Sequence, residues 1–240
     1  MKKKKTANRT DAKGNRPEHS APAEQFYDRK EASQYSQNAR MMQIQTNLAK
    51  RAVHLLNLPS KRPALLLDLG CGTGFGGRVI EKAGHAWIGT DISAEMLGAG
   101  RPSAHSDHIC HDMGCFLPFR SGMFDGAISI SAVQWLCVAT KPEHNPEGRL
   151  RACLHGLRRC LKRGARAVLQ FYPEDASQME MIRMAALECH FAGSLVVDYP
   201  VSEAAKKFFL VLIAPSQAPQ KRSASSSGGA SKTMKRAMKR

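Results

Sequence analysis

A cluster of glycines follows an apolar run near residue 65, and this junction restricts the possible folds more than any other stretch of the chain. Residues 65–77 read LLLDLGCGTGFGG, and a helical pattern continues to residue 83. A short, continuous apolar run is typical of a strand that is buried on both faces of a parallel sheet. A glycine-rich turn between such a strand and a helix lets a ligand approach the backbone N–H groups at the start of the helix. The stretch therefore predicts an α/β protein with a binding site at this turn.

Strand and helix patterns alternate along the rest of the chain. Apolar residues at spacings of three and four predict a helix over 31–58, which Pro59 ends, and the other predicted helices are 75–83, 149–161 and about 175–190. The predicted strands are 64–70, 86–92, 107–113, 124–131, 166–173, 194–200 and 206–214. A short connection joins the last two strands, so they form an antiparallel hairpin. We expect a seven-stranded, mostly parallel sheet that ends in this hairpin, with helices on both faces.

The two ends of the chain carry most of its positive charge. Of the net charge of +16, residues 1–16 supply +6 and residues 215–240 supply +7, and the second segment is rich in Ser and Gly. Segments of this composition cannot form a core, so we expect disordered basic tails over 1–16 and 215–240 around a folded domain over 17–214. Basic tails bind phosphate backbones or act as nuclear address signals, and a purely solubilising role is the alternative.

No apolar run approaches the ~20 residues that are needed to cross a membrane, and the N-terminal MKKKK has no apolar segment behind it. The seven cysteines include no CxxC pair, which favours reduced thiols over a disulfide framework or a zinc knuckle. We expect an intracellular protein with no membrane association.

The glycine-rich turn allows two cofactor interpretations. Gly72, Gly74 and Gly77 match the dinucleotide fingerprint GxGxxG, which is weak evidence by itself. Asp68 stands inside the strand before the first glycine, an order that is typical of class I methyltransferases and favours S-adenosylmethionine. Asp91 ends the next strand and suits the ribose hydroxyls of either cofactor. The alternative is that the glycines only allow close helix–sheet packing and that Asp91 caps a helix.

Two further regions are expected to border the cofactor. Asp112 follows the third strand, where an acid commonly accepts the adenine amino group, although a surface turn is the alternative. Tyr27, Tyr35 and Arg40 precede the first strand and could close over the cofactor, with Arg40 binding the methionine carboxylate. An exposed arginine on a packing helix is the alternative for Arg40. The residues expected around the cofactor are Asp68, Gly70, Cys71, Gly72, Gly74, Asp91, Ile92, Asp112, Met113, Ser129, Tyr27, Tyr35 and Arg40.

The stretch SISAVQWLC, residues 129–137, follows the fourth strand and carries no charge. Ligands of open α/β sheets lie along the carboxyl ends of the strands, so the stretch should border the methyl group. It lacks an Asn/Asp-Pro-Pro-aromatic box, a lysine-centred base set and a cluster of acids, and we expect Cys137 to be buried in a helix. An acceptor with a free lone pair, such as N7 of guanine, needs no general base. Ser131, Gln134 and Trp135 would then position the base, whereas core packing is the alternative for Trp135.

Several motifs together resemble one family. DLGCGTG, GTDIS and CHDMGCFLPFRSGMFDGAISISAVQWLC are similar to the eukaryotic 18S rRNA (guanine-N7)-methyltransferases, and the resemblance covers about 17–214. It implies the class I fold, S-adenosylmethionine as methyl donor, and methylation of a guanine in pre-18S rRNA during maturation of the small ribosomal subunit. The implied location is the nucleus and nucleolus, with the cytoplasm as a further compartment. A small-molecule methyltransferase and an assembly factor whose methylation is dispensable stay open as alternatives.

The resemblance also implies a small zinc-binding activator protein that forms a heterodimer with this chain. Such a partner adds a strand to the sheet edge beside the third strand, here near His108–Asp112. His105, His108, Cys110 and His111 lie close together in sequence, but on a strand His111 points away from the face that His108 and Cys110 share. We therefore expect no metal site in this chain. Two features depart from the family, namely the short C-terminal tail and the loop after Gly100, where the helix should be short.

Overall fold

The computed structural model describes residues 16–59, 62–100, 106–199, 201–202 and 205–215. The two predicted tails lie outside these residues, except for Arg16 and Pro215. His105 also lies outside them. The helices are η1 (Pro17–His19), α1 (Ala23–Phe26), α2 (Arg29–Gln37), α3 (Ala39–Leu56), α4 (Phe75–Lys82), α5 (Ala94–Ala99), η2 (Val133–Cys137), α6 (Pro146–Cys160) and α7 (Ala176–Glu188). The strands are β1 (Leu65–Leu69), β2 (Ala86–Asp91), β3 (Ser106–Cys110), β4 (Phe124–Ile130), β5 (Leu161–Phe171), β6 (Ala192–Asp198) and β7 (Lys207–Ile213). No helix within the described residues is long and apolar enough to span a membrane.

The seven strands form one sheet in the order β3-β2-β1-β4-β5-β7-β6. The pairs from β3 to β5 are parallel, whereas β7 runs antiparallel to both β5 and β6. The sheet order reverses between β1 and β4, which is where ligands bind in open α/β sheets. The predicted sheet with its terminal antiparallel hairpin is confirmed.

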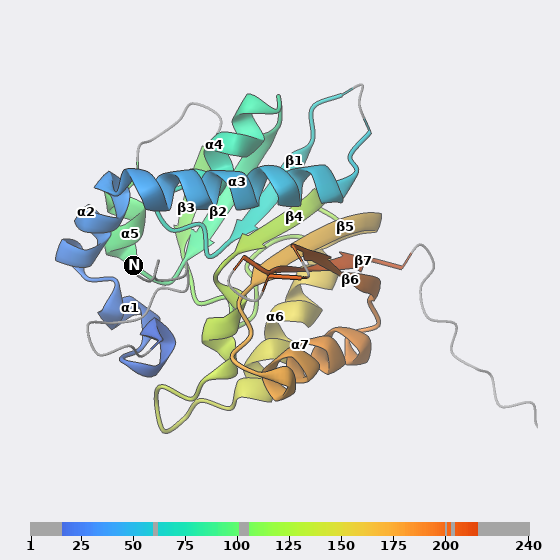
Figure 1. The fold of residues 1–240 in the computed structure, drawn as a ribbon. Coiled ribbons are helices and arrows are strands. Elements are labelled where there is room, and N and C mark those ends of the chain that lie inside the picture. The colour runs from blue at the N-terminus through green and yellow to red at the C-terminus, as the bar shows by residue number, and fades with distance from the viewer. Residues whose placement is uncertain (1–15, 60–61, 101–105, 200, 203–204, 216–240) are drawn as a thin grey trace, which may run out of the picture.

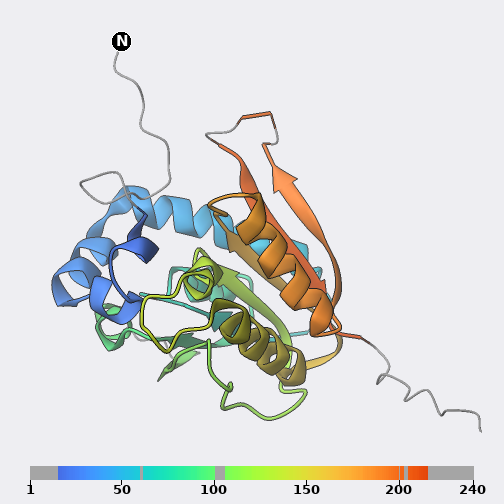
Figure 2. The ribbon, with the colours of Figure 1, turned by 90° about the horizontal axis from the view of Figure 1, so that it is seen from below.

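Helices cover both faces of the sheet, as predicted. A hydrophobic core lies on each face of the sheet. Alternate residues of β5 contribute to the two cores, because successive side chains of a strand point to opposite faces. Val168 packs in a cluster with residues of α3 and α4, whereas Ala167 and Leu169 pack with residues of α6 and α7. Figure 1 shows α3 and α4 on one side of the sheet and α6 and α7 on the other, and Figure 2 shows α6 and α7 from the side that they cover.

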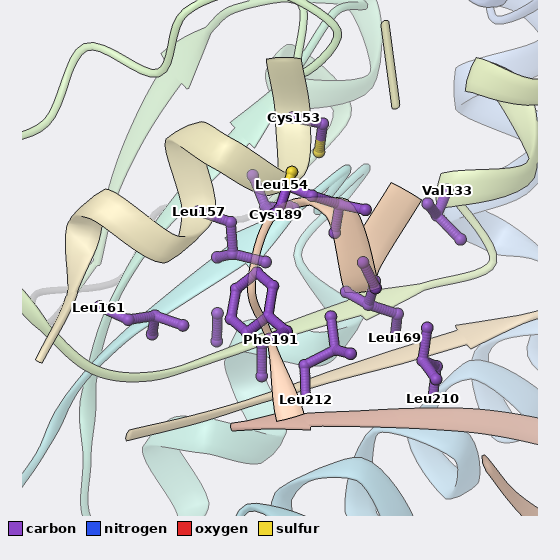
Figure 3. Packing of buried hydrophobic residues seen from close by; sticks show 14 of the residues in the cluster. Val133, Cys153, Leu154, Leu157, Leu161, Leu169, Cys189, Phe191, Leu210 and Leu212 are labelled. Carbon is purple, nitrogen blue, oxygen red and sulfur yellow. The ribbon is translucent and has the colours of Figure 1, made fainter. Parts of the chain in front are cut away.

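The core beneath α6 is built from aliphatic residues that come from distant parts of the chain. Leu154 and Leu157 of α6 face Leu169 of β5 and Leu212 of β7, with Phe191 between them (Figure 3). All five side chains are almost completely buried. Burial of a side chain of this size contributes about 1.5–3 kcal/mol, so this cluster fixes the hairpin and the helices on the parallel part of the sheet.

The structure has two helices, α2 and α3, where a single helix was predicted over 31–58. The prediction is wrong at Asn38, where the helix is interrupted. Asn38 is extended, and its side chain accepts a hydrogen bond of 2.9 Å from the backbone N–H of Met41. It therefore ends α2 and caps α3, whose own end is Asn57 in a left-handed conformation. Asp28 caps α2 in the same way through the N–H of Glu31, at 2.8 Å.

All seven strands end one to three residues earlier than predicted, and for two of them the difference affects the site. β3 ends at Cys110, although the N–H of His111 still donates to the Asp91 carbonyl at 2.8 Å. β4 ends at Ile130, because Ser131 takes a left-handed conformation with φ of 55° and turns the chain out of the sheet. The residues predicted for the site at 111–113 and 131 thus lie in connecting segments at the carboxyl edge of the sheet.

Candidate active site

A cavity lies at the carboxyl ends of β1, β2, β4 and β5. Its wall joins residues from the glycine-rich turn, the end of β2, the segments after β3 and β4, and the helices that precede β1. In Figure 1 the short helices α1 and α2 gather with α5 at this end of the sheet. The cavity therefore brings together parts of the chain that are more than 150 residues apart in sequence.

The glycine-rich turn is fixed to the neighbouring strand by backbone hydrogen bonds. The N–H groups of Gly70 and Cys71 both donate to the Thr90 carbonyl, at 2.8 and 3.0 Å. Gly72 has a φ of 56°, a conformation that glycine adopts without strain, and its N–H donates to Asp91 Oδ2 at 2.8 Å. Gly70, Cys71 and Gly72 line the cavity, and the two glycines expose backbone there without a side chain.

Asp91 is a half-buried carboxylate that is not the cap of α5. Its Oδ1 accepts from the N–H of Ser93 at 2.9 Å, and the hydroxyl of Ser93 in turn caps α5 through the N–H of Met96. Burial raises the pKa of Asp91, and the backbone donors of Ser93, Gly72 and Ile92 partly offset that rise. Each carboxylate oxygen has a second lone pair, so Asp91 can still accept hydrogen bonds from a ligand.

Asp68 lies inside β1 and is almost fully buried, at 2% exposure. Its Oδ2 has no hydrogen-bond partner among the described residues. A Cβ at Gly76 would lie 2.5 Å from this oxygen, so glycine leaves the carboxylate room. Burial, and then repulsion by Asp91, raises the pKa of Asp68 to about 7. A buried carboxylate oxygen without a partner is costly unless a ligand supplies a donor or a positive charge.

The segment after β3 contributes Asp112 and Met113 to the cavity wall. Both carboxylate oxygens of Asp112 accept from Arg149 Nη2 at 2.8 Å, and Oδ1 also accepts from the N–H of Gly114 at 2.8 Å. Arg149 stands near the start of α6, which Asn145 caps. The structure therefore brings Asp112 to the cavity as an ion-paired acid.

The uncharged wall after β4 also lines the cavity. Ser131 Oγ donates to Gln170 Oε1 at 2.8 Å, and Gln134 Nε2 donates to the Ser131 carbonyl at 3.0 Å. The Trp135 ring packs against Phe26 and Tyr27, with centroids 5.8 and 5.7 Å apart. Trp135 therefore holds the N-terminal segment at the cavity and at the same time forms part of its wall.

Three of the expected cofactor residues do not line the cavity. Ser129 is 1% exposed, and its hydroxyl donates to the Leu69 carbonyl at 2.8 Å. Gly74 has a φ of 77° and stands at the N-terminus of α4. Arg40 is exposed in the first turn of α3. By contrast Tyr27 and Tyr35 both line the cavity, and the Tyr35 ring stacks on Phe75 at 5.7 Å.

The N-terminal lead-in supplies residues that the sequence did not single out. Arg16 and Glu18 line the cavity, although Arg16 belongs to the predicted disordered tail over 1–16 and no role at the site is predicted for Glu18. Arg16 donates to the carbonyls of Tyr172 and Pro173 at 2.7 and 2.9 Å, contacts that span more than 150 residues. Lys141 and Glu24 form an ion pair of 2.7 Å at the same side of the site. No local sequence pattern predicts contacts between residues that are so far apart in the chain.

The motifs of this chain match known methyltransferases. Residues 67–169 match the family described as a methyltransferase domain. The Arabidopsis thaliana 18S rRNA (guanine-N(7))-methyltransferase RID2 is 52% identical over 200 residues, which are 82% of this chain and 69% of that protein. The Mus musculus 18S rRNA (guanine-N(7))-methyltransferase is 50% identical over 202 residues, 84% of this chain and 72% of that protein.

The fold also has relatives among solved structures. A Haloferax volcanii methyltransferase, solved in complex with the Trm112 methyltransferase activator, superimposes with a TM-score of 0.54. The match covers 77% of this chain and 98% of that chain at 18% identity. At this level of identity the likeness establishes the arrangement of strands and helices and nothing finer.

Proposed function

The chain belongs to the 18S rRNA (guanine-N7)-methyltransferase family, and we propose that it methylates N7 of a guanine in the RNA of the small ribosomal subunit. The methyl donor is S-adenosylmethionine. The observation that carries the proposal is a single cavity that contains both the acids Asp68 and Asp91 and the uncharged wall of Ser131, Gln134 and Trp135. The first group suits the cofactor and the second suits a flat, uncharged acceptor.

The acids of the cavity fit the cofactor's chemistry. S-adenosylmethionine supplies a methyl group on a positively charged sulfonium. Asp68 has an oxygen without a partner and would offset the cofactor's positive charge. Asp91 keeps lone pairs for the ribose hydroxyls, while Asp112, Met113 and Ile92 would border the adenine.

The part of the cavity that binds the target base needs to orient this base and does not need to deprotonate it. N7 of guanine carries a free lone pair at neutral pH, so methyl transfer to it requires no general base. Gln134 and Trp135 would hold the base in line with the methyl group, and alignment of this kind supplies much of a rate enhancement. Because guanine inside a helix is stacked and paired, the target base would be flipped or unpaired when it enters the cavity.

We also propose that a small zinc-binding activator protein binds this chain at the β3 edge of the sheet. β3 is the first strand in the sheet order and pairs only with β2 among the described strands. The predicted contact at His108–Asp112 then covers the last residues of β3 and the segment that follows. The activator, together with the two basic tails, would supply charge for RNA, and the tails would direct the chain to the nucleus and nucleolus.

The proposal is tested by mapping N7-methylguanine in ribosomal RNA from cells with and without this protein. We expect one guanine of the small-subunit RNA to lose its methyl group in cells that lack the protein, and Asp68→Ala to fail to restore it. Methyl transfer by the purified protein and its activator to small molecules only would contradict the proposal. Normal subunit production with Asp68→Ala would separate methylation from a role in assembly.

A further inference from the structure

Glu18 is a buried acid at the cavity that the mechanism above does not use. It is 3% exposed and lies in η1, the first turn of the described chain. Arg16 Nη1 donates to its Oε1 at 3.2 Å, and the same guanidinium is fixed by the carbonyls of Tyr172 and Pro173. Glu18 is therefore held rigidly at the cavity wall, as a residue that recognises a ligand must be.

The order of the strands places Glu18 relative to the cofactor. Asp91 ends β2 and Asp68 lies in β1, whereas Tyr172, to which Arg16 ties Glu18, directly follows β5. In the sheet, β4 lies between β1 and β5. The cofactor acids thus occupy one end of the cavity and Glu18 the other, with the wall that follows β4 between them.

Glu18 and Gln134 both have oxygens that can accept a ligand's hydrogen bonds. Glu18 Oε2 has no partner in the part of the chain that the structure describes. Gln134 is 6% exposed and lines the same cavity, and its Oε1 also has no partner there. A buried acceptor without a donor, such as Gln134 Oε1, is costly, and Glu18 Oε2 is a second acceptor at the same cavity, so the pair suits a ligand that offers several N–H groups on one edge.

Guanine offers such an edge on the side opposite to N7. Its N1–H and its exocyclic amino group are both donors, whereas adenine has an acceptor at N1. We propose that Glu18, with Gln134 as the second acceptor, binds the N1–H and amino group of the target guanine. This inference rests on the proposed function and names the residues that select the base. A carboxylate at the far end of the cavity then leaves N7 facing the cofactor end, and it repels the N1 lone pair of adenine.

The inference is tested with RNA that carries guanine or hypoxanthine at the methylated position. Hypoxanthine keeps N7, O6 and N1–H but lacks the amino group. We expect the protein, in complex with its activator, to show a kcat/KM for hypoxanthine RNA that is lower by about 10-fold or more, as expected for the loss of a hydrogen bond to a charged group. In Glu18→Gln the activity on guanine RNA should fall and the preference for guanine should shrink toward one.

Glu174→Gln is the matched control. Glu174 is exposed and pairs with His19 at 2.9 Å, so it anchors the same turn from outside the cavity. This variant should keep the preference for guanine. Equal use of both RNAs by the unmodified protein, or an equal loss on both RNAs in Glu18→Gln, would overturn the inference and leave the proposed function intact. No methylation of guanine RNA by the unmodified protein would overturn both.

Discussion

The backbone N–H of Gly72 donates to Asp91 Oδ2 at 2.8 Å, so the glycine-rich turn and the end of β2 form one unit at the cavity. The hydrogen bond joins two motifs that are 19 residues apart in sequence. It orients the Asp91 carboxylate and fixes the backbone of the turn, so a single interaction organises two sides of the cavity.

Asp91→Asn is expected to weaken cofactor binding with little change in shape. The amide has one acceptor oxygen, so it cannot accept from the N–H groups of both Gly72 and Ser93 and still bind ribose hydroxyls. We expect the Kd for S-adenosylmethionine to rise by about 10- to 100-fold in isothermal titration calorimetry. Glu180→Gln, which changes an exposed carboxylate on α7, serves as the control. An unchanged Kd in Asp91→Asn would contradict the role of Asp91.

The raised pKa of Asp68 makes the stability of the ligand-free protein depend on pH. Its pKa is about 7 in the folded chain and near 3.8 in the unfolded chain, so between these values the folded state binds the extra proton. Stability then falls as the pH rises from about 4 to 7, by roughly 1 kcal/mol per pH unit from this group. The difference in the free energy of unfolding between Asp68→Asn and the unmodified protein, measured with urea from pH 5 to 8, should grow up to about pH 7 and then level off. A constant difference would exclude the raised pKa.

The fold could be predicted from the sequence because its strands carry a strong local signal. The run Leu65–Leu69 is apolar apart from Asp68, and the short connection before Lys207–Ile213 requires a hairpin. The break at Asn38 gives no such signal, since apolar spacing continues across it and asparagine is tolerated within helices as well as at their caps. The same break explains Arg40, which lies in the first turn of α3 and is exposed instead of facing the cavity.

The candidate site likewise contains residues that a local sequence pattern predicts and residues that only the assembled fold brings together. Asp68, Gly72 and Asp91 belong to one local pattern, and this pattern alone predicts them for a cofactor site. Glu18 becomes a cavity residue only through Arg16, whose partners at Tyr172 and Pro173 come from the other end of the domain. Contacts of this range depend on the assembled sheet, and single-sequence patterns carry no information about them.

Helix α4, which follows the glycine-rich turn, packs so closely on the sheet that Gly77 should not tolerate a side chain. A Cβ at Gly77 would overlap the ring of Trp87, which is 3% exposed and is held by a hydrogen bond of 2.7 Å to Glu81. We expect Gly77→Ala to lower the free energy of unfolding by about 1–3 kcal/mol in chemical denaturation. Gly98→Ala is the matched control in α5, because no heavy atom lies within 4 Å of its Cβ position. It should be neutral or stabilising by up to about 1 kcal/mol. Equal effects of the two variants would rule out the proposed overlap.

At one backbone position on the edge of β3, a substitution should affect partner binding without affecting the fold. Because the N–H of His111 donates inward to Asp91, alternation along the strand directs the N–H of Cys110 away from β2. Cys110→Pro removes this outward donor, and proline is tolerated on an edge strand where the N–H faces outward. We expect the variant to bind S-adenosylmethionine but to lose co-purification with the activator when the two are co-expressed. Cys110→Ser keeps the N–H and should co-purify normally. Normal co-purification of Cys110→Pro would show that the activator does not add a strand at this position, whereas loss in both variants would assign the contact to the thiol.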